Sequence, residues 1–156
     1  MDIIFTPWRY SYITGADRPA GCVFCNLPKE TDDRNNLILY RAELNYVIMN
    51  LFPYSNGHLM VVPFHHEPWL KNLDQPTSSE MMELAKLAQI ALEKEYQPDG
   101  FNIGWNLGKS AGAGVAEHLH LHVVPRWSGD ASFMSVIGET RTIPEDLGVS
   151  YEKLLK

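Results

Sequence analysis

Residues 118–124 read His-Leu-His-Leu-His-Val-Val, and this alternation decides how the chain is interpreted. In a β-strand, residues i, i+2 and i+4 point to the same face of the sheet. The pattern therefore predicts a row of three imidazoles on one face and apolar side chains on the other. The row comprises His118, His120 and His122. Imidazole acts as a nucleophile, a general acid or base, or a metal ligand near neutral pH, so the row indicates a chemically active surface.

The composition is that of one soluble globular domain. A chain of 156 residues with 45% hydrophobic and 21% charged residues can bury a substantial core. A net charge of −6 argues against a broad nucleic-acid-binding surface. The apolar stretches are too short to span a bilayer, and the N-terminus does not resemble a signal peptide. We therefore expect a cytoplasmic protein that binds neither nucleic acid nor membranes.

The chain reads as a single domain over residues 1–156, with an N-terminal arm at 1–20 and a C-terminal extension at 128–156. A long helix is expected to begin at Thr77 or Ser78, with a capping box formed by Thr77 and Glu80, and to end before Pro98. Strands are expected at 37–41, 46–49, 58–63 and 101–106, followed by the histidine strand. The order of strands, one helix and further strands favours an α+β fold with an antiparallel sheet.

The loop that leads into the histidine strand is rich in small residues. It runs from Gly108 to Gly114 and contains Lys109 and Ser110. Exposed backbone N–H groups in such a loop can bind phosphate oxygens. The loop precedes a strand and lacks the Walker A pattern, which argues against a P-loop nucleoside triphosphatase. By itself it is equally typical of a flexible turn, but its position before three histidines favours anion binding.

The two cysteines, Cys22 and Cys25, form a Cys-x-x-Cys pair. Such a pair can be a redox centre, half of a zinc site or two unrelated thiols. A redox motif would lie at the start of a helix after a strand, and that context is not evident here. A zinc site needs two more ligands, for which histidine is the natural supplement.

Taken together, these motifs resemble the histidine triad (HIT) superfamily, whose signature is His-x-His-x-His followed by apolar residues. The resemblance covers residues 20–127. Besides the triad it includes the cysteine pair, Asn50 eight residues before His58, the stretch Gly57-His-Leu-Met-Val-Val-Pro63 and Asn106. Two stretches resemble the branch containing diadenosine tetraphosphate hydrolases and phosphorylases: Pro125-Arg-Trp-Ser-Gly-Asp130 after the triad and Asn106-Leu-Gly-Lys-Ser-Ala-Gly112 before it.

The resemblance implies a fold and a mechanism. The fold would be a five-stranded antiparallel sheet with one long helix, the sheet continuing across a homodimer. The substrate would be a purine nucleotide or dinucleoside polyphosphate cleaved at the α-phosphate, with no cofactor for the chemistry. In the triad His120 would be the nucleophile and His122 would stabilise the phosphate, and His58 would orient His120. The substrate contacts would come from Asn50, Phe24, Leu51, Asn106, Lys109, Ser110 and Gly114.

The resemblance also implies a structural zinc ion in a subset of the family. Its ligands here would be Cys22, Cys25, His66 and the first triad histidine, His118. A complete set of two cysteines and two histidines is a closed site, so the metal would brace the strand without taking part in the chemistry.

One position departs from the family pattern. Many members have Gln and then Ser or Thr where this chain has Gly114 and Val115. The absence of these polar side chains leaves open whether water or inorganic phosphate releases the intermediate, and a glycine there would make room for phosphate. Three alternatives remain: a nucleoside phosphoramidate hydrolase, a non-catalytic nucleotide sensor, and a metalloenzyme that uses the three histidines as ligands.

Overall fold

The computed structural model describes residues 21–130 and 145–155, so the predicted arm at 1–20 and most of the predicted extension lie outside the described residues. The described chain forms an antiparallel sheet of five strands in the order β1-β2-β3-β5-β4. The strands are β1 (Ile38–Arg41), β2 (Asn45–Met49), β3 (Leu59–Pro63), β4 (Gly100–Trp105) and β5 (Leu121–Arg126). The predicted α+β fold with an antiparallel sheet is confirmed.

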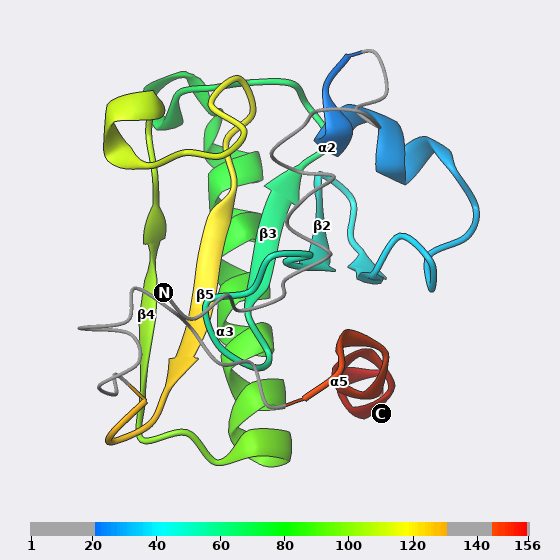
Figure 1. Ribbon diagram of the computed structural model, residues 1–156. Helices are drawn as coiled ribbons and strands as arrows, with labels where there is room; N and C mark the ends of the chain where they lie inside the picture. Colours follow the sequence, from blue (N-terminus) through cyan, green and yellow to red (C-terminus); the bar gives the residue numbers. More distant parts are fainter. Residues whose placement is uncertain (1–20, 131–144, 156) are drawn as a thin grey trace, which may run out of the picture.

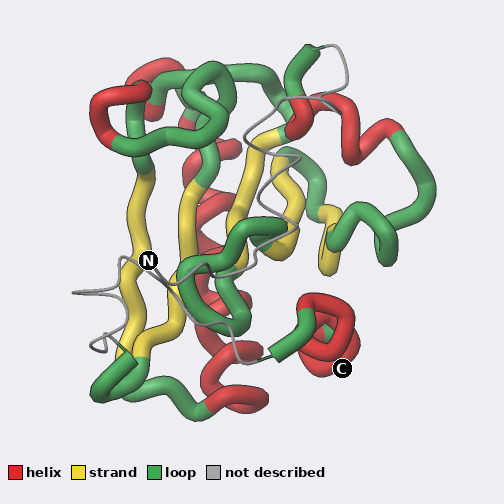
Figure 2. The backbone as a smooth tube through the Cα atoms, viewed as in Figure 1, coloured by secondary structure: helices red, strands yellow, loops and turns green. Residues whose placement is uncertain are grey.

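The long helix α3 (Gln75–Tyr96) crosses one face of this sheet (Figures 1 and 2). Its apolar side chains recur at helical spacing, so they form a stripe that packs on the sheet. The main core between helix and sheet includes Met81, Leu84, Ala88, Leu92, Leu119, Leu121 and Val123. The predicted apolar face of the histidine segment therefore points toward α3, and the opposite face of the sheet carries the histidines.

The predicted start of this helix was wrong by one turn. The N-cap is Asp74, whose carboxylate accepts a hydrogen bond from the amide of Thr77 at 2.8 Å. Pro76 lies in the first turn, where its missing N–H costs no helical hydrogen bond. Glu80 does not close a capping box, because its carboxylate accepts from two backbone amides of the β1–β2 turn at 3.1 and 2.9 Å.

The histidine segment is only partly a strand. β5 begins at Leu121, so His118 and His120 lie before it, contrary to the prediction of three histidines within one strand. The neighbouring strand β3 ends at Pro63, which has no N–H to donate. The amide of Leu119 donates to the carbonyl of Glu67, which lies after β3, at 2.7 Å. The chain therefore leaves the sheet ladder just where the first two histidines occur.

The remaining elements are short, and α5 was not predicted. They are α2 (Val23–Asn26), η1 (Leu27–Lys29), η2 (Leu70–Asn72), η3 (Lys109–Ala111) and α5 (Leu147–Leu154). α5 packs beside α3 and β1, where the buried Tyr151 hydroxyl donates to the carbonyl of Ile38 at 2.9 Å. An ion pair of 2.6 Å between Arg34 and Glu152 adds a second contact to this helix.

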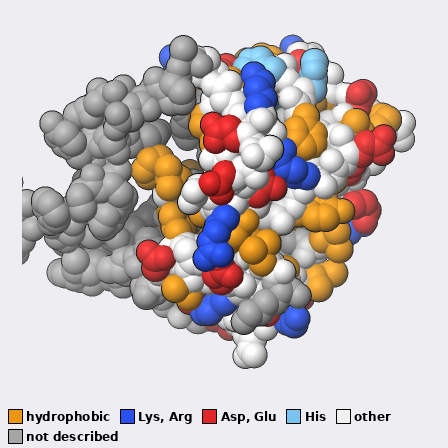
Figure 3. Space-filling model, turned by 90° about the vertical axis from the view of Figure 1, so that its right-hand side faces the viewer, with side chains coloured by type: hydrophobic (Ala, Val, Ile, Leu, Met, Phe, Trp, Pro, Cys, Tyr) orange, Lys and Arg blue, Asp and Glu red, His pale blue; other side chains and the backbone are white. Residues whose placement is uncertain are grey.

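The surface carries both signs of charge. On the face shown in Figure 3, basic and acidic side chains are interspersed, with hydrophobic side chains between them. Among the helices of the described residues, we find none with the length and apolar character needed to cross a membrane.

Candidate active site

The site is built where the β2–β3 loop and the first residues of β3 meet the beginning of β5. In the sheet, His122 lies opposite Met60 of β3 and Gly104 of β4. A Cβ added to Gly104 would have no atom of residues 21–130 or 145–155 within 4 Å, so these residues leave the sheet surface beside His122 open at this point. His58 is the residue before β3 and is fully buried. The structure therefore brings three of the predicted catalytic histidines, His58, His120 and His122, into one cluster.

The orientation of His120 is set by a bond to the backbone. Its Nδ1 lies 2.8 Å from the carbonyl oxygen of His118, and a carbonyl oxygen can only accept. Nδ1 therefore carries the proton, and Nε2 presents a lone pair. The side chain is 5% exposed and packs against the ring of Phe24, with 5.0 Å between ring centroids. This arrangement fixes one nitrogen of His120 in a form suited to nucleophilic attack.

His122 lies next to His120 and is hydrogen-bonded to His58. The rings of His120 and His122 are 4.8 Å apart between centroids and nearly perpendicular. His58 Nε2 and His122 Nδ1 are separated by 2.9 Å. The other nitrogen of His122, Nε2, is buried and has no hydrogen-bond partner among residues 21–130 and 145–155. A buried polar atom without a partner is costly in a folded protein, and such atoms are often functional.

Burial keeps His120 and His122 uncharged. Desolvation, with a smaller contribution from the neighbouring His120, lowers the pKa of His122 to about 4. Desolvation also lowers the pKa of His120, although its hydrogen bond to the His118 carbonyl acts in the opposite direction. Both imidazoles are therefore neutral at pH 7. A neutral imidazole has the lone pair that attack on phosphorus requires.

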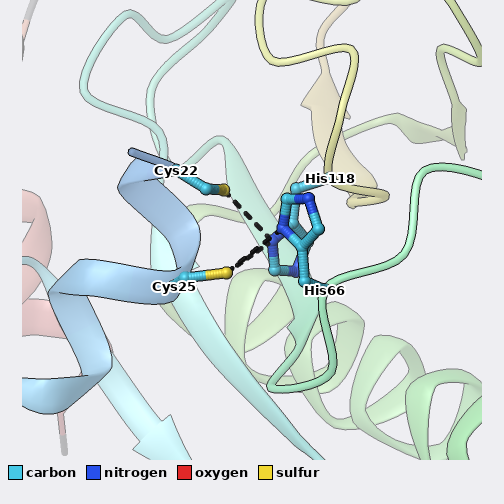
Figure 4. Close-up of side chains that lie close together, drawn as sticks. All are labelled: Cys22, Cys25, His66 and His118. Carbon is cyan, nitrogen blue, oxygen red and sulfur yellow. Dashed lines mark hydrogen bonds between the residues drawn. The ribbon is translucent and has the colours of Figure 1, made fainter. Parts of the chain in front are cut away.

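The predicted metal ligands form a second cluster, which includes His118 (Figure 4). The ligand atoms of Cys22, Cys25, His66 and His118 all lie within 4.8 Å of one another. His118 Nδ1 is 3.3 and 3.5 Å from the two sulfur atoms, and His66 Nδ1 is 3.2 Å from Cys25 Sγ. The cysteines come from the start of α2, His66 follows β3, and His118 precedes β5.

The hydrogen bond of His118 Nε2 leaves Nδ1 in the form that binds a metal. Its Nε2 lies 2.9 Å from the carbonyl oxygen of Pro63, so Nε2 carries the proton and Nδ1 directs its lone pair at the cysteines. A metal-binding histidine commonly has its second nitrogen bonded to a carbonyl in this way. Burial lowers the pKa of His118 to about 4, which keeps Nδ1 free of a proton. The donor set and its orientation fit a zinc ion.

The predicted nucleoside-binding residues differ in burial and in their contacts with the histidines. Phe24 is buried and contacts both His118 and His120. Asn50 follows β2, and its Nδ2 lies 3.4 Å from His58 Nδ1. Leu51 is 58% exposed, which leaves its side chain available to a ligand.

The predicted phosphate-binding loop follows β4. Asn106 is half-buried at the start of this loop, whereas Lys109 and Ser110, in η3, and Gly114 are exposed. Val115, at the position that departs from the family pattern, packs against the second hydrophobic cluster, which includes Phe24 and Met60. Its role in the fold is therefore apolar packing.

Sequence reasoning missed two residues of the site. Pro63 was treated as the end of a strand, but its carbonyl orients His118. Tyr54 lies in the β2–β3 loop, for which the sequence predicts no site residue besides Asn50, Leu51 and His58, but its ring packs on both His58 and His122, with centroid distances of 4.6 and 5.8 Å. An aromatic residue four positions before a candidate catalytic histidine was the available signal for Tyr54.

Comparison with known proteins agrees with the resemblance noted in the sequence. Residues 31–129 match the family described as HIT domain. The chain is 40% identical over 151 residues to AP-4-A phosphorylase of Mycobacterium tuberculosis, covering 91% of this chain and 76% of that protein. It is 33% identical over 95 residues to bis(5'-nucleosyl)-tetraphosphatase (asymmetrical) of Schizosaccharomyces pombe, covering 61% of this chain and 52% of that protein.

Solved structures support the same fold. The crystal structure of a Zn-bound histidine triad family protein from Mycobacterium smegmatis superposes with a TM-score of 0.69 at 31% identity. The match covers 86% of this chain and 91% of that one. The fold predicted from the sequence is therefore that of known histidine triad structures.

Proposed function

The chain belongs to the HIT domain family, and from this premise we propose that it is an enzyme that cleaves dinucleoside polyphosphates at the α-phosphate. Its relatives include a phosphorylase and a tetraphosphatase named for substrates of this class. The covalent intermediate would be a nucleotidyl group on His120. Water or inorganic phosphate would then release it.

The observation that carries this proposal is the orientation of His120. Its Nδ1 is bonded to the His118 carbonyl at 2.8 Å, so the free lone pair is on Nε2. In the first step Nε2 attacks the α-phosphorus, and the bond from phosphorus to the bridging oxygen breaks. The remaining polyphosphate leaves with the electron pair of that bond. In the second step an oxygen of water or phosphate attacks the same phosphorus, and the P–N bond breaks with its electrons returning to Nε2. An attacking water gives up one proton to solvent as the P–O bond forms.

The neighbouring histidines would assist both steps. His122 lies beside the nucleophile, where a donor nitrogen can stabilise the charge that develops on the phosphoryl oxygens. His58 holds His122 through the 2.9 Å contact between their rings. The prediction that His58 orients His120 directly is thereby modified, because the contact of His58 is with His122. His118 would support the nucleophile through its carbonyl.

The substrate would lie across the open sheet surface beside the triad. We assign the base to the region of Phe24 and the exposed Leu51, and the ribose hydroxyls to Asn50. The polyphosphate would follow the loop after β4, whose polar contributors are Asn106, Lys109, Ser110 and the backbone at Gly114. The exposed position of Gly114 supports space for a phosphate acceptor there.

A structural zinc ion is the second part of the proposal. Cys22, Cys25, His66 and His118 would hold it, since their ligand atoms already cluster within 4.8 Å. Bound there, zinc would cross-link α2 to the triad segment and supply no step of the reaction. Elemental analysis tests this: we expect one zinc per wild-type chain and a loss of zinc in Cys22→Ser. Equal zinc in both proteins would rule the site out.

A homodimer and a cytoplasmic location complete the proposal. β4 lies at the edge of the sheet, and Ile103 on it is 43% exposed. On α3, Leu87 and Ile90 are 58% and 60% exposed. An edge strand and exposed apolar side chains both suit pairing with a second copy. Sedimentation of wild type and Ile103→Lys tests the dimer, which should dissociate in the variant.

A reducing cytoplasm would keep both cysteines available as zinc ligands.

Product analysis with diadenosine tetraphosphate tests the enzymatic activity. With cleavage at the α-phosphate, water as acceptor gives AMP and ATP, and inorganic phosphate as acceptor gives ADP and ATP. His120→Ala should abolish turnover and the acid-labile adduct, whereas His65→Ala, which removes an exposed histidine, should retain both. Two ADP without added phosphate, or binding without turnover in wild type, would contradict the proposal. Faster P–N cleavage of a nucleoside phosphoramidate would favour the alternative hydrolase.

A further inference from the structure

The loop between β2 and β3 directs two hydrogen-bond donors at one nitrogen of His58. The backbone N–H of Tyr54 donates to His58 Nδ1 at 3.0 Å. The side-chain nitrogen of Asn50 lies 3.4 Å from the same atom. The Asn50 amide is oriented by its oxygen, which accepts from the backbone amide of Phe52 at 2.9 Å. Because amide nitrogens only donate, His58 Nδ1 must present a lone pair to them.

The tautomer of His58 fixes the tautomer of His122, because their rings are hydrogen-bonded. A neutral imidazole carries one N–H, so His58 must carry its proton on Nε2 and donate it to His122 Nδ1, 2.9 Å away. His122 must then carry its own proton on Nε2. That nitrogen is the buried atom without a partner among the described residues. His122 therefore presents a donor, and not a lone pair, beside the nucleophile.

The local fold holds the Tyr54 amide in place. The amide of His58 donates to the carbonyl of Ser55 at 3.2 Å, which closes the turn around Gly57. Gly57 has a φ of +72°, and an added Cβ would approach a side-chain carbon of Leu92 to 2.7 Å, so the turn packs tightly against α3. The Tyr54 ring covers the two imidazoles and is inclined by 29° to that of His122.

We propose that Tyr54 is a positioning residue whose backbone N–H sets the tautomer of His58 and, through it, that of His122. With the opposite tautomers, His122 would direct a lone pair at the anionic phosphoryl oxygens, and a stabilising donor would become a repulsive acceptor. A fixed tautomer has the same importance in serine proteases, where the wrong one lowers kcat by about four orders of magnitude. The consequence for turnover rests on the function proposed above, but the tautomer pattern itself does not.

The test removes only the N–H. Tyrosine at 54 is replaced by its α-hydroxy acid, which converts the Pro53–Tyr54 amide into an ester. The ester oxygen is an acceptor facing His58 Nδ1, so it disfavours the wild-type tautomer. In ¹⁵N-histidine-labelled protein, NMR should show His58 and His122 protonated on Nε2 in the wild type. The ester should move the proton of both rings toward Nδ1.

The kinetic expectation follows from the same change. For diadenosine tetraphosphate, kcat should fall at least about tenfold in the ester, since loss of one oxyanion donor costs about a hundred- to thousandfold. KM should change by less than about twofold, because no substrate contact is removed. An ester at Ala42, whose amide donates to Asn45 at 2.9 Å, controls for the loss of a backbone hydrogen bond and should leave both tautomers unchanged. Tyr54→Phe and Tyr54→Ala keep the amide and should keep the tautomers.

The outcomes separate this inference from the proposed function. If His58 carries its proton on Nδ1 in the wild type, or if the ester leaves both tautomers unchanged, the inference is overturned whatever the substrate. The wild-type spectrum gives this answer even if the ester protein does not fold. A wild type with the expected tautomers but no activity on dinucleotides would support the inference and overturn the proposed function alone.

Discussion

Replacing His122 by asparagine should make the protein less sensitive to mild acid. Burial, with a smaller contribution from His120, lowers the pKa of His122 from 6.5 to about 4 in the folded protein. In the unfolded chain the imidazole titrates near its ordinary value. Between about pH 6.5 and about pH 4, the unfolded state therefore binds a proton that the folded state does not. The free energy of unfolding must fall as the pH falls through this window.

The size of the effect follows from the pKa difference. One pKa unit corresponds to about 1.4 kcal/mol, so lowering the pH from 7 to 5 should remove about 2 kcal/mol through His122 alone. Urea unfolding at both pH values, at a fixed zinc concentration, gives this loss for wild type and His122→Asn. The variant should lose about 2 kcal/mol less than wild type. His65→Asn, which removes an exposed histidine, should lose as much as wild type. An equal loss in all three proteins would refute the reasoning.

Three further substitutions test the fold that supports the site, each by urea unfolding at pH 7. Tyr151→Phe removes the buried hydroxyl that bonds α5 to β1, so the free energy of unfolding should fall by about 1 to 2 kcal/mol. If the free energy of unfolding falls by less than about 0.3 kcal/mol in this variant, the bond from Tyr151 does not stabilise the packing of α5 on β1. Asp74→Ala should cost about 1 kcal/mol as an N-cap, whereas Ser78→Ala should cost clearly less. Gly57→Ala should cost more than about 1 kcal/mol, because φ is +72° and the new methyl meets α3; an unchanged midpoint would contradict the tight turn.

The local hydrophobic pattern of the sequence was sufficient to predict that one face of the sheet packs on α3. The alternation in 118–124 correctly placed Leu119, Leu121 and Val123 against α3, because side-chain direction in an extended segment has a period of two. This rule holds even where the segment is not hydrogen-bonded as a strand. The end of the ladder was not predictable from the segment itself, since it depends on Pro63 and on the carbonyl of Glu67, both from another part of the chain.

The start of α3 and the existence of α5 could not be predicted from the local sequence for a different reason. Asp74, Thr77 and Ser78 are all good N-cap residues, so composition alone left the start of α3 ambiguous. Pro76 was the available discriminator, because proline is favoured in the first turn and disfavoured further inside a helix. α5 has only eight residues, and helices of that length depend on tertiary contacts such as the bond from Tyr151 to β1. Those contacts leave little signal in the local sequence.

The triad motif is informative because one of its bonds is local and the others are not. The contact from His120 to the His118 carbonyl spans two residues, so the motif itself orients the candidate nucleophile. The side chain of His118 is bonded to Pro63, which is 55 positions away, and His122 to His58, which is 64 positions away. An alternating row of histidines therefore specifies the tautomer of the middle ring, whereas the partners of the other two rings come from distant parts of the chain. Here a cysteine pair meets the first ring, and a loop with two donors reaches the third through His58.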